Sequence, residues 1–370
     1  MRARVNPFLV PEQVPHGDRE AVRAFHRTLP GYAPTPLHRM PGLAESLGLA
    51  DLYLKDEGQR FGLLAFKALG AAWALHRLRE RDPRFTTVSA ATEGNHGRAV
   101  AWSARRLGLE AVIYIRASAA PLRVDRLESE GARVVLVEGS YDDAVARCAR
   151  ESAANGWQVV SDTGYEGYLE IPHWVAEGYT TLFEEADEQR AAAGLPAPDV
   201  VIVQAGVGGL LHAAIEQCRA WPNPPVVVSV EPAEADPLFE SINTPDGDPA
   251  LSRGKQNSIM AGLNTGRPSL SAWPAIRRGV ELFLTIEDSW AEEAMRRLAS
   301  PAKGDPAIVA GESGAAGVAA LLALSQTPEL GLARDFLRLN RRRRVMVIVT
   351  EGATDPDNYA RIVGRRPEGR

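Results

Sequence analysis

Short apolar runs alternate with amphipathic stretches along almost the whole 370-residue chain, and this alternation constrains the fold more than any other feature. The pattern predicts βα units and a mainly parallel sheet. Because the apolar runs are continuous rather than alternating, we expect helices on both faces of that sheet. The expected strands are 87–91, 111–115, 133–137, 158–161, 200–204, 226–231, 282–286 and 345–350.

The stretches between these strands read as helices. Apolar residues recur at helical spacing over 99–107, and small residues dominate 314–324. A helix over 142–154 would begin after Ser140, which can accept a hydrogen bond from a free N–H of the first turn. Residues 191–198 read as a linker and 243–255 as a surface loop, and loops of that length are often functional.

Composition narrows the function classes. A net charge of −5 argues against nucleic acid as a partner, and no run of 18 apolar residues predicts a membrane span. The segment 1–7 lacks the apolar centre of a signal peptide, so a cytoplasmic location is expected. Cys148 and Cys218 stand far apart and outside any paired motif, which argues against a disulfide framework or a zinc site.

Lys67 has an unusual setting for a lysine. It is flanked by Ala65, Phe66, Ala68 and Leu69, and a lysine desolvated by such neighbours has a lowered pKa and a nucleophilic amine. That is the chemistry of a lysine that forms a Schiff base. A lysine at the edge of a helix explains the segment equally well when it is taken alone.

The segment Thr92-Glu93-Gly94-Asn95-His96-Gly97 follows an expected strand and opens a helix. Successive backbone N–H groups at such a junction form an anion site, to which Thr92 can add a hydroxyl and Asn95 an amide. A capped turn with two glycines is the alternative. His96 by itself is more often structural than catalytic.

A second junction between a strand and a helix, 204–211, contains Gly206, Gly208 and Gly209. Its N–H groups can cradle a phosphate. Leu211 stands where the dinucleotide fingerprint needs a third glycine, and the ending of a triphosphate-binding loop is missing. A phosphate monoester without a nucleotide is the better ligand.

Two further strand ends carry polar groups. Thr350 places a neutral hydroxyl at the end of the last expected strand, where ligands gather in α/β sheets, although it can simply terminate the strand.

Asp162 and Glu166 lie close to Tyr165 and Tyr168 in the sequence, and a carboxylate beside aromatic surface can have the raised pKa of a general base. A turn at Asp162 and a helix-start charge at Glu166 are the alternative.

Taken together, these segments predict one ligand that has an aldehyde, a phosphate, an oxygen attached to a ring and a nitrogen within that ring. Pyridoxal phosphate has all four. The order of motifs resembles the fold-type II pyridoxal-phosphate enzymes, the tryptophan synthase β family, over nearly the whole chain. The resemblance implies an α/β fold of two three-layer open-sheet domains. The motifs are Thr35-Pro-Leu37, Lys55-Asp-Glu57, Phe66-Lys67, the 92–97 segment, Gly206-Val-Gly-Gly209 and Thr350.

Within that family, several longer segments resemble the diaminopropionate ammonia-lyases, which cleave 2,3-diaminopropionate through an aminoacrylate to pyruvate and ammonia. The resemblance implies a carbon–nitrogen lyase acting on a small amino acid. The segments are 60–67, 162–168 with Ile171-Pro172 and Trp174, 259–263, 304–306 and 311–316.

The resemblance also assigns roles. Lys67 would form the internal aldimine, Asn95 would bond the ring 3-oxygen and Thr350 would face the ring nitrogen. Because a neutral hydroxyl does not keep that nitrogen protonated, prompt loss of a β substituent is favoured over transamination. The cofactor-binding set is Lys67, Phe66, Asn95, Gly206, Val207, Gly208, Gly209, Leu210 and Thr350, and the substrate-binding set is Thr92, Gly94, His96 and Tyr168.

Asp162 would be the base toward the L-isomer. The family has a second aspartate, which acts on the D-isomer, at the position occupied here by Glu93. One extra methylene displaces that carboxylate, so the L-isomer is the expected substrate.

The expected architecture is a large domain of residues 1–86 and 188–370, which carries Lys67, the glycine loop and Thr350, with a small domain of residues 87–187 inserted in it. Closure of the small domain would complete the site, and the family implies a homodimer. A β-replacement synthase and a serine/threonine dehydratase remain alternatives on the same cofactor. A non-catalytic binding protein is the alternative from another class.

Overall fold

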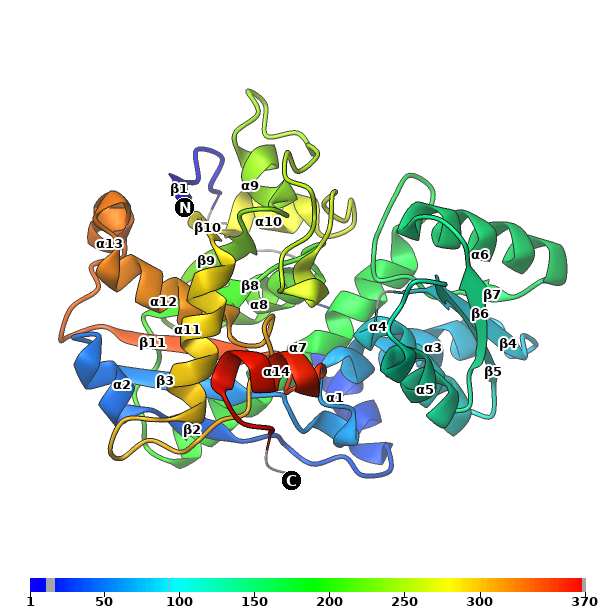
Figure 1. Ribbon diagram of the computed structural model, residues 1–370, viewed down its shortest axis with the longest axis horizontal. Helices are drawn as coiled ribbons and strands as arrows, with labels where there is room; N and C mark the ends of the chain where they lie inside the picture. The colour runs from blue at the N-terminus through cyan, green and yellow to red at the C-terminus, as the bar shows by residue number, and fades with distance from the viewer. Residues whose placement is uncertain (11–16, 93, 368–370) are drawn as a thin grey trace.

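Two separate sheets organise the chain (Figure 1). The computed structural model describes residues 1–10, 17–92 and 94–367. The larger sheet contains β1 (Arg2–Val5), β2 (Leu37–Arg39), β3 (Asp51–Asp56), β8 (Val200–Gln204), β9 (Val226–Pro232), β10 (Leu282–Ile286) and β11 (Arg344–Val349). Their order is β1-β10-β9-β8-β11-β3-β2. The five central strands are parallel, whereas the edge strands β1 and β2 pair antiparallel.

The helices that accompany the larger sheet are α1 (Arg19–Thr28), α2 (Pro41–Ser46), α3 (Lys67–Arg81), α7 (Glu170–Ala192), α8 (Gly209–Arg219), α9 (Pro237–Ile242), α10 (Trp273–Gly279), α11 (Asp288–Ala299), α12 (Ala316–Gln326), α13 (Gly331–Leu337) and α14 (Pro356–Val363). Short 3₁₀ turns lie at Arg60–Gly62, Ala261–Leu263 and Pro328–Leu330.

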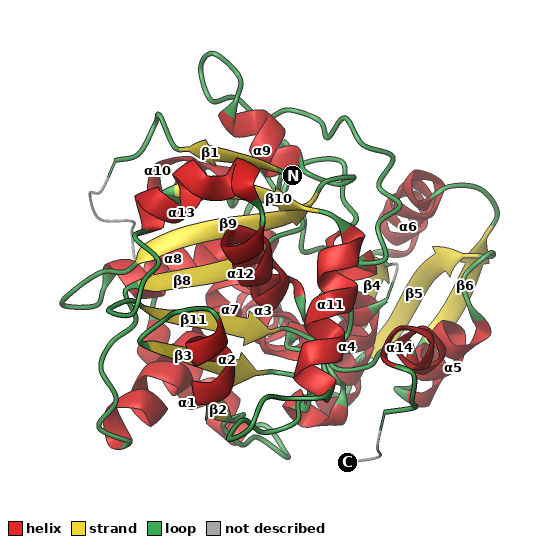
Figure 2. Cartoon of the chain, turned by 60° about the vertical axis from the view of Figure 1, so that its left-hand side comes forward, coloured by secondary structure: helices red, strands yellow, loops and turns green. Residues whose placement is uncertain are grey.

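Helices cover both faces of the larger sheet, as its continuous apolar strands predict (Figure 2). Alternate residues of β8 point to opposite faces. Val201 and Val203 join the core that includes α3, α7 and α8, whereas Val200 and Ile202 join the core that includes α11 and α12. Because both faces of the central strands are covered, a ligand can reach this sheet only at the ends of its strands.

The smaller sheet is fully parallel. It contains β4 (Thr87–Ala91), β5 (Glu110–Arg116), β6 (Arg133–Val137) and β7 (Gln158–Val159) in the order β6-β5-β4-β7. Its helices are α4 (Asn95–Arg106), α5 (Pro121–Ser129) and α6 (Tyr141–Asn155). Ser140 accepts from the Asp143 N–H and caps α6 as predicted, with the Asp143 side chain closing a capping box.

All eight predicted strands are present, four with the predicted ends and four with ends that differ by one or two residues. The missed strands are β1, β2 and β3. The first two are short antiparallel edges, which apolar runs do not signal. The third reads Asp-Leu-Tyr-Leu-Lys-Asp, and its charged Lys55 is fully buried against Glu185 at 2.8 Å. Charges hidden in pairs conceal a strand from hydrophobic pattern alone.

Helix α7 connects the two sheets, and it passes unusually close to α3. A β-carbon at Gly178 would lie 2.5 Å from the Leu69 carbonyl, and one at Gly70 would lie 2.5 Å from the Val175 carbonyl. Two glycines therefore allow backbone contact between the helices. None of the described helices combines the length and hydrophobicity needed to span a bilayer. The domain boundaries at 86/87 and 187/188 stay a prediction.

Candidate active site

Lys67 is the first residue of α3 and is fastened to the end of β11. The Phe66 N–H donates to the Thr350 carbonyl at 3.2 Å, and the Gly352 N–H donates to the Leu64 carbonyl at 2.9 Å. The loop before Lys67 turns sharply, with φ of +61° at Leu64. These contacts hold the lysine beside the strand end that carries Thr350.

The Lys67 amine forms an ion pair with Asp162, at 2.8 Å from Oδ2, and the two side chains are 20% and 19% exposed. Burial lowers the pKa of the Lys67 amine, but the charge and hydrogen bond of Asp162 outweigh burial and hold that pKa above its usual value. The expectation of a lowered lysine pKa was therefore wrong. The sequence could not reveal this partner, which lies 95 positions away.

Asp162 was expected to have a raised pKa, and that expectation was wrong for the same reason. Burial raises the pKa of this carboxyl, but the positive charges of Lys67 and His96 hold it below its usual value. The carboxylate is therefore ionised at neutral pH. It follows β7, at the end of the smaller sheet, and reaches across to the lysine of the larger one.

The turn after β4 is built around the Thr92 hydroxyl, which accepts from the Gly94 N–H at 2.9 Å and the Gly97 N–H at 3.0 Å. Asn95 begins α4, and its Nδ2 donates to the Glu351 carboxylate at 2.5 Å. Glu93 lies outside the described residues. The predicted anion-binding turn is thus a helix start whose threonine is used in the turn itself.

His96 lies between the backbone and Asp162. Its Nε2 is 3.0 Å from the Val160 carbonyl, which can only accept, so Nε2 carries a proton and donates it there. Its buried Nδ1, which has no hydrogen-bond partner among the described residues, is 3.8 Å from Asp162 Oδ2. Nδ1 of the imidazole therefore faces the carboxylate, which it attracts when it is protonated.

The glycine loop joins β8 to α8. Gly208 has φ of +104°, and a β-carbon there would lie 2.4 Å from Ile276 Cδ1, so only glycine suits the position. Within the described chain, no residue accepts a hydrogen bond from the backbone N–H groups of 206–211. The free donors at the start of an 11-residue helix suit an anion.

Tyr179, on α7, lies between the lysine and the glycine loop. Lys67 Nζ is 5.8 Å from the centre of its ring, and a β-carbon at Gly209 would lie 3.6 Å from its Cε2. Phe66 packs edge-on against the same ring at 4.6 Å. Lys67 and the glycine loop therefore both lie next to one buried phenol.

Thr350 is buried, and its Oγ1 accepts from Gln204 Nε2 at 3.0 Å. Gln204 ends β8 immediately before the glycine loop, so this bond joins two neighbouring strand ends. The hydroxyl of Tyr168, like that of Thr92, is already used within the protein. It donates to the Val159 carbonyl and accepts from the Ser161 N–H, each at 3.0 Å, which leaves the ring, stacked on Tyr165 at 4.9 Å, as the part that can contact a substrate.

Sequence reasoning missed three residues of this site, namely Gln204, Tyr179 and Glu351. Each touches a predicted site residue. Glu351 directly follows Thr350, so its position at a strand end was the one available signal. Tyr179 lies inside a long helix and carried no signal at all.

These residues meet the four requirements of pyridoxal phosphate. An amine is available at Lys67, free N–H donors line the glycine loop, an amide stands at Asn95 and a neutral hydroxyl at Thr350. Among the described residues, no group of three His, Cys, Asp or Glu could hold a metal ion. Cys148 and Cys218 are buried free thiols.

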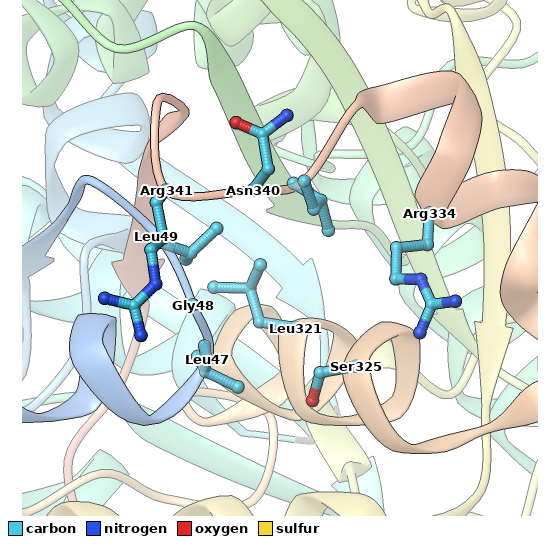
Figure 3. Close-up of a pocket in the computed structure, with 9 residues that line it drawn as sticks. Leu47, Gly48, Leu49, Leu321, Ser325, Arg334, Asn340 and Arg341 are labelled. Carbon is cyan, nitrogen blue, oxygen red and sulfur yellow. The ribbon is translucent and has the colours of Figure 1, made fainter.

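A hollow of about 380 Å³ lies elsewhere, among leucines with Arg334 and Arg341 at its rim (Figure 3). It is at the amino end of β11, whereas Thr350 follows the carboxyl end. Six strand residues separate the two by about 20 Å. This hollow is therefore not part of the site.

The fold and this set of side chains define a pyridoxal-phosphate enzyme. The family model of pyridoxal-phosphate dependent enzymes matches residues 28–351. The chain is 38% identical to diaminopropionate ammonia-lyase of Salmonella typhimurium, over 92% of this chain and 91% of that protein. The chain belongs to the pyridoxal-phosphate dependent enzymes and, within them, to the diaminopropionate ammonia-lyase family.

Solved structures agree with this assignment. The chain superposes on the holo form of diaminopropionate ammonia-lyase from Escherichia coli with a TM-score of 0.91 and 36% identity, over 98% of this chain and 96% of that one. It superposes on the same enzyme in complex with an aminoacrylate-PLP azomethine reaction intermediate with a TM-score of 0.90 and 36% identity, over the same shares of the two chains. These matches favour the lyase over the β-replacement and dehydratase alternatives.

Proposed function

We propose that this enzyme eliminates ammonia from 2,3-diaminopropionate, with the L-isomer preferred, and yields pyruvate and ammonia. The observation that carries the proposal is the 2.8 Å contact between Lys67 and Asp162. It places an amine that can bind the cofactor next to a carboxylate that can take a proton from the substrate. The two groups come from different sheets, so they meet only in the folded chain.

Several residues would hold the cofactor. Gly206, Val207, Gly208, Gly209 and Leu210 would direct backbone N–H groups at the phosphate, and α8 would add the positive end of its dipole. Phe66 would pack beside Lys67, Asn95 would donate to the ring 3-oxygen and Thr350 would face the ring nitrogen. When bound, pyridoxal phosphate supplies an aldehyde that condenses with amines and a ring that withdraws electrons from Cα.

Proton movement would fall to Asp162 and Lys67. Asp162 is ionised at neutral pH because Lys67 and His96 stabilise its charge, so it can accept the Cα proton. His96, protonated at Nδ1 3.8 Å away, would help to hold Asp162 in place. The Lys67 amine, which lies 2.8 Å from Asp162, would deliver a proton to the departing β-amino group.

Substrate orientation would come from the smaller sheet. The turn at Thr92, Gly94 and His96 would hold the substrate carboxylate, and the ring of Tyr168 would lie beside it. Asp162 would act as the base toward the L-isomer. Glu93, one methylene longer than the family aspartate, would serve the D-isomer poorly.

We further propose that the enzyme is a cytoplasmic homodimer whose small domain spans residues 87–187. The support is membership in its family together with the grouping of β4–β7 in their own sheet. Approach of that sheet to the larger one would bring the substrate turn over the cofactor residues.

Product analysis tests the function. Purified enzyme supplied with pyridoxal phosphate should release pyruvate and ammonia from L-2,3-diaminopropionate, more slowly from the D-isomer, and much more slowly from serine or threonine. A new amino acid formed when a thiol is supplied would support the β-replacement synthase instead. Activity on threonine with none on diaminopropionate would support the dehydratase, and a protein that stays colourless with pyridoxal phosphate would support a binding protein.

A further inference from the structure

Glu351 occupies the junction of the three cofactor-facing segments. It directly follows Thr350 and pairs with Ala65 in an isolated antiparallel bridge, two residues before Lys67. Its side chain then reaches the smaller sheet, where Oε2 accepts from Asn95 Nδ2 at 2.5 Å. This one residue therefore touches the segments of Lys67, Thr350 and Asn95.

The Glu351 carboxylate is buried, with 6% of the residue exposed. Burial holds its pKa above the usual value, and the hydrogen bonds with Asn95 and Ser313, which favour the ionised form, offset only part of that rise. The bond to Asn95 thus offsets part of the cost of burying the carboxylate. A close, buried bond of this kind leaves the amide of Asn95 little freedom to rotate.

The direction of this bond determines which end of the amide is available. Asn95 presents Nδ2 to Glu351 and not Oδ1, which is the arrangement that a carboxylate requires because its ionised oxygens only accept hydrogen bonds. The nitrogen carries two hydrogens. One is used by Glu351, and the other remains for an acceptor in the site, which a ring oxygen provides.

We infer that Glu351 is a positioning residue: it fixes the orientation of the Asn95 amide so that the second N–H is directed at the ring 3-oxygen of the cofactor. Without it, the amide can turn over and present an oxygen, which repels the ring oxygen. The inference rests on the proposed function, because it needs Asn95 to face the cofactor.

Glu312 provides a matched control. It is 5% exposed and accepts from Asn358 Nδ2, also at 2.5 Å. Asn358 belongs to α14 and is not among the residues proposed for the cofactor. Burial and the nearby charge of Glu351 raise the pKa of Glu312 to about 7, so Glu312→Gln removes a partly ionised carboxyl from a similar pair and takes no contact from Asn95.

The experiment compares Glu351→Gln with Glu312→Gln in the full chain. The readouts are the dissociation constant of pyridoxal phosphate, the position of its absorbance maximum when bound, and kcat and KM for L-2,3-diaminopropionate. Glu351→Gln is expected to weaken cofactor binding roughly tenfold, to shift the absorbance and to lower kcat more than it raises KM. Glu312→Gln is expected to leave the absorbance maximum in place.

A double-mutant cycle with Asn95→Ala separates positioning from general damage to the fold. If Glu351 acts through Asn95, the loss of cofactor affinity caused by Glu351→Gln should shrink severalfold when Asn95 is already alanine. Additive losses, or equal spectra for the two glutamine variants, would overturn the inference. Because cofactor affinity is measured without turnover, a wild-type enzyme that binds pyridoxal phosphate but releases no pyruvate would refute the proposed function and leave this test intact.

Discussion

The two sheets of the molecule contribute to the site in different ways. Three adjacent strands of the larger sheet, in the order β8-β11-β3, lead to the glycine loop, Thr350 and Lys67. Two adjacent strands of the smaller sheet, β4 and β7, lead to the turn at Thr92 and to Asp162. Most groups suited to the cofactor therefore gather on the larger sheet and groups suited to the substrate on the smaller one, and Asn95, which begins α4, is the cofactor group that the smaller sheet contributes.

The two sheets also differ in how deeply their strands are buried. Each strand of the β8-β11-β3 group is almost fully buried, with helices on both faces. In the smaller sheet, β6 is largely exposed or half-buried, and the core on one face consists of only a few side chains around Tyr114 and Cys148. A rigid platform suits a permanently held cofactor, whereas a lightly anchored sheet suits a part that moves over the substrate.

The largest effect should come from Lys67→Ala. The variant removes the one amine of the larger sheet that faces Asp162, so it should lose the yellow absorbance of the bound cofactor and all detectable turnover. Absorbance spectra and a pyruvate assay measure both losses. A variant that keeps its colour and activity would take Lys67 out of the mechanism.

Asp162→Asn should separate the roles of the two sheets. Loss of a general base typically costs about 10²–10⁴-fold in rate, while cofactor binding, to which the larger sheet contributes most of the groups, should change little. Steady-state kinetics with the L-isomer and a cofactor titration provide the two measurements. A loss of cofactor affinity as large as the loss of rate would break the division between the sheets.

Asp162→Asn should also change how the stability of the protein depends on pH. The folded-state pKa of Asp162 lies below its usual value of 3.8, so its ion pair stabilises the fold above that pH and the stabilisation is lost as the pH falls further. The raised pKa of Lys67 gives stabilisation that is present below 10.5 and is lost at higher pH. In cofactor-free protein, Asp162→Asn should lower the unfolding temperature most between pH 3.8 and 10.5, where both charges of the ion pair are present. The decrease should become smaller as the pH falls below 3.8. Thermal unfolding measured across this pH range tests the prediction.

The smallest effect should come from Gly208→Ala, with Gly364→Ala as its control. Both glycines have positive φ, +104° and +84°, so both variants share a backbone strain of about 1–2 kcal/mol. Only Gly208 adds a contact with Ile276 and a place in the glycine loop, whereas a β-carbon at Gly364 meets nothing within 4 Å. Cofactor affinity should fall for Gly208→Ala alone, and equal affinities would remove Gly208 from the phosphate site.

Much of the site could be predicted because its parts are local. Each predicted segment is a strand followed by a turn and a helix, and such a unit can be recognised from a few neighbouring residues, as at Gly206–Gly209. Strand β3, which was missed, depends instead on a contact with a residue far away in the sequence. The buried charge of Lys55 is intelligible only beside Glu185, which is 130 positions away.

Sequence by itself determined the chemical inventory: an amine, a glycine loop, an amide and a hydroxyl, each at the end of a strand. The tertiary structure decided what those groups do to one another. It paired Lys67 with Asp162 and thereby reversed the direction expected for both pKa values, and it joined Asn95 to Glu351. The physical reason is that electrostatic effects depend on distance in space, and the order of strands in a sheet sets that distance independently of separation along the chain.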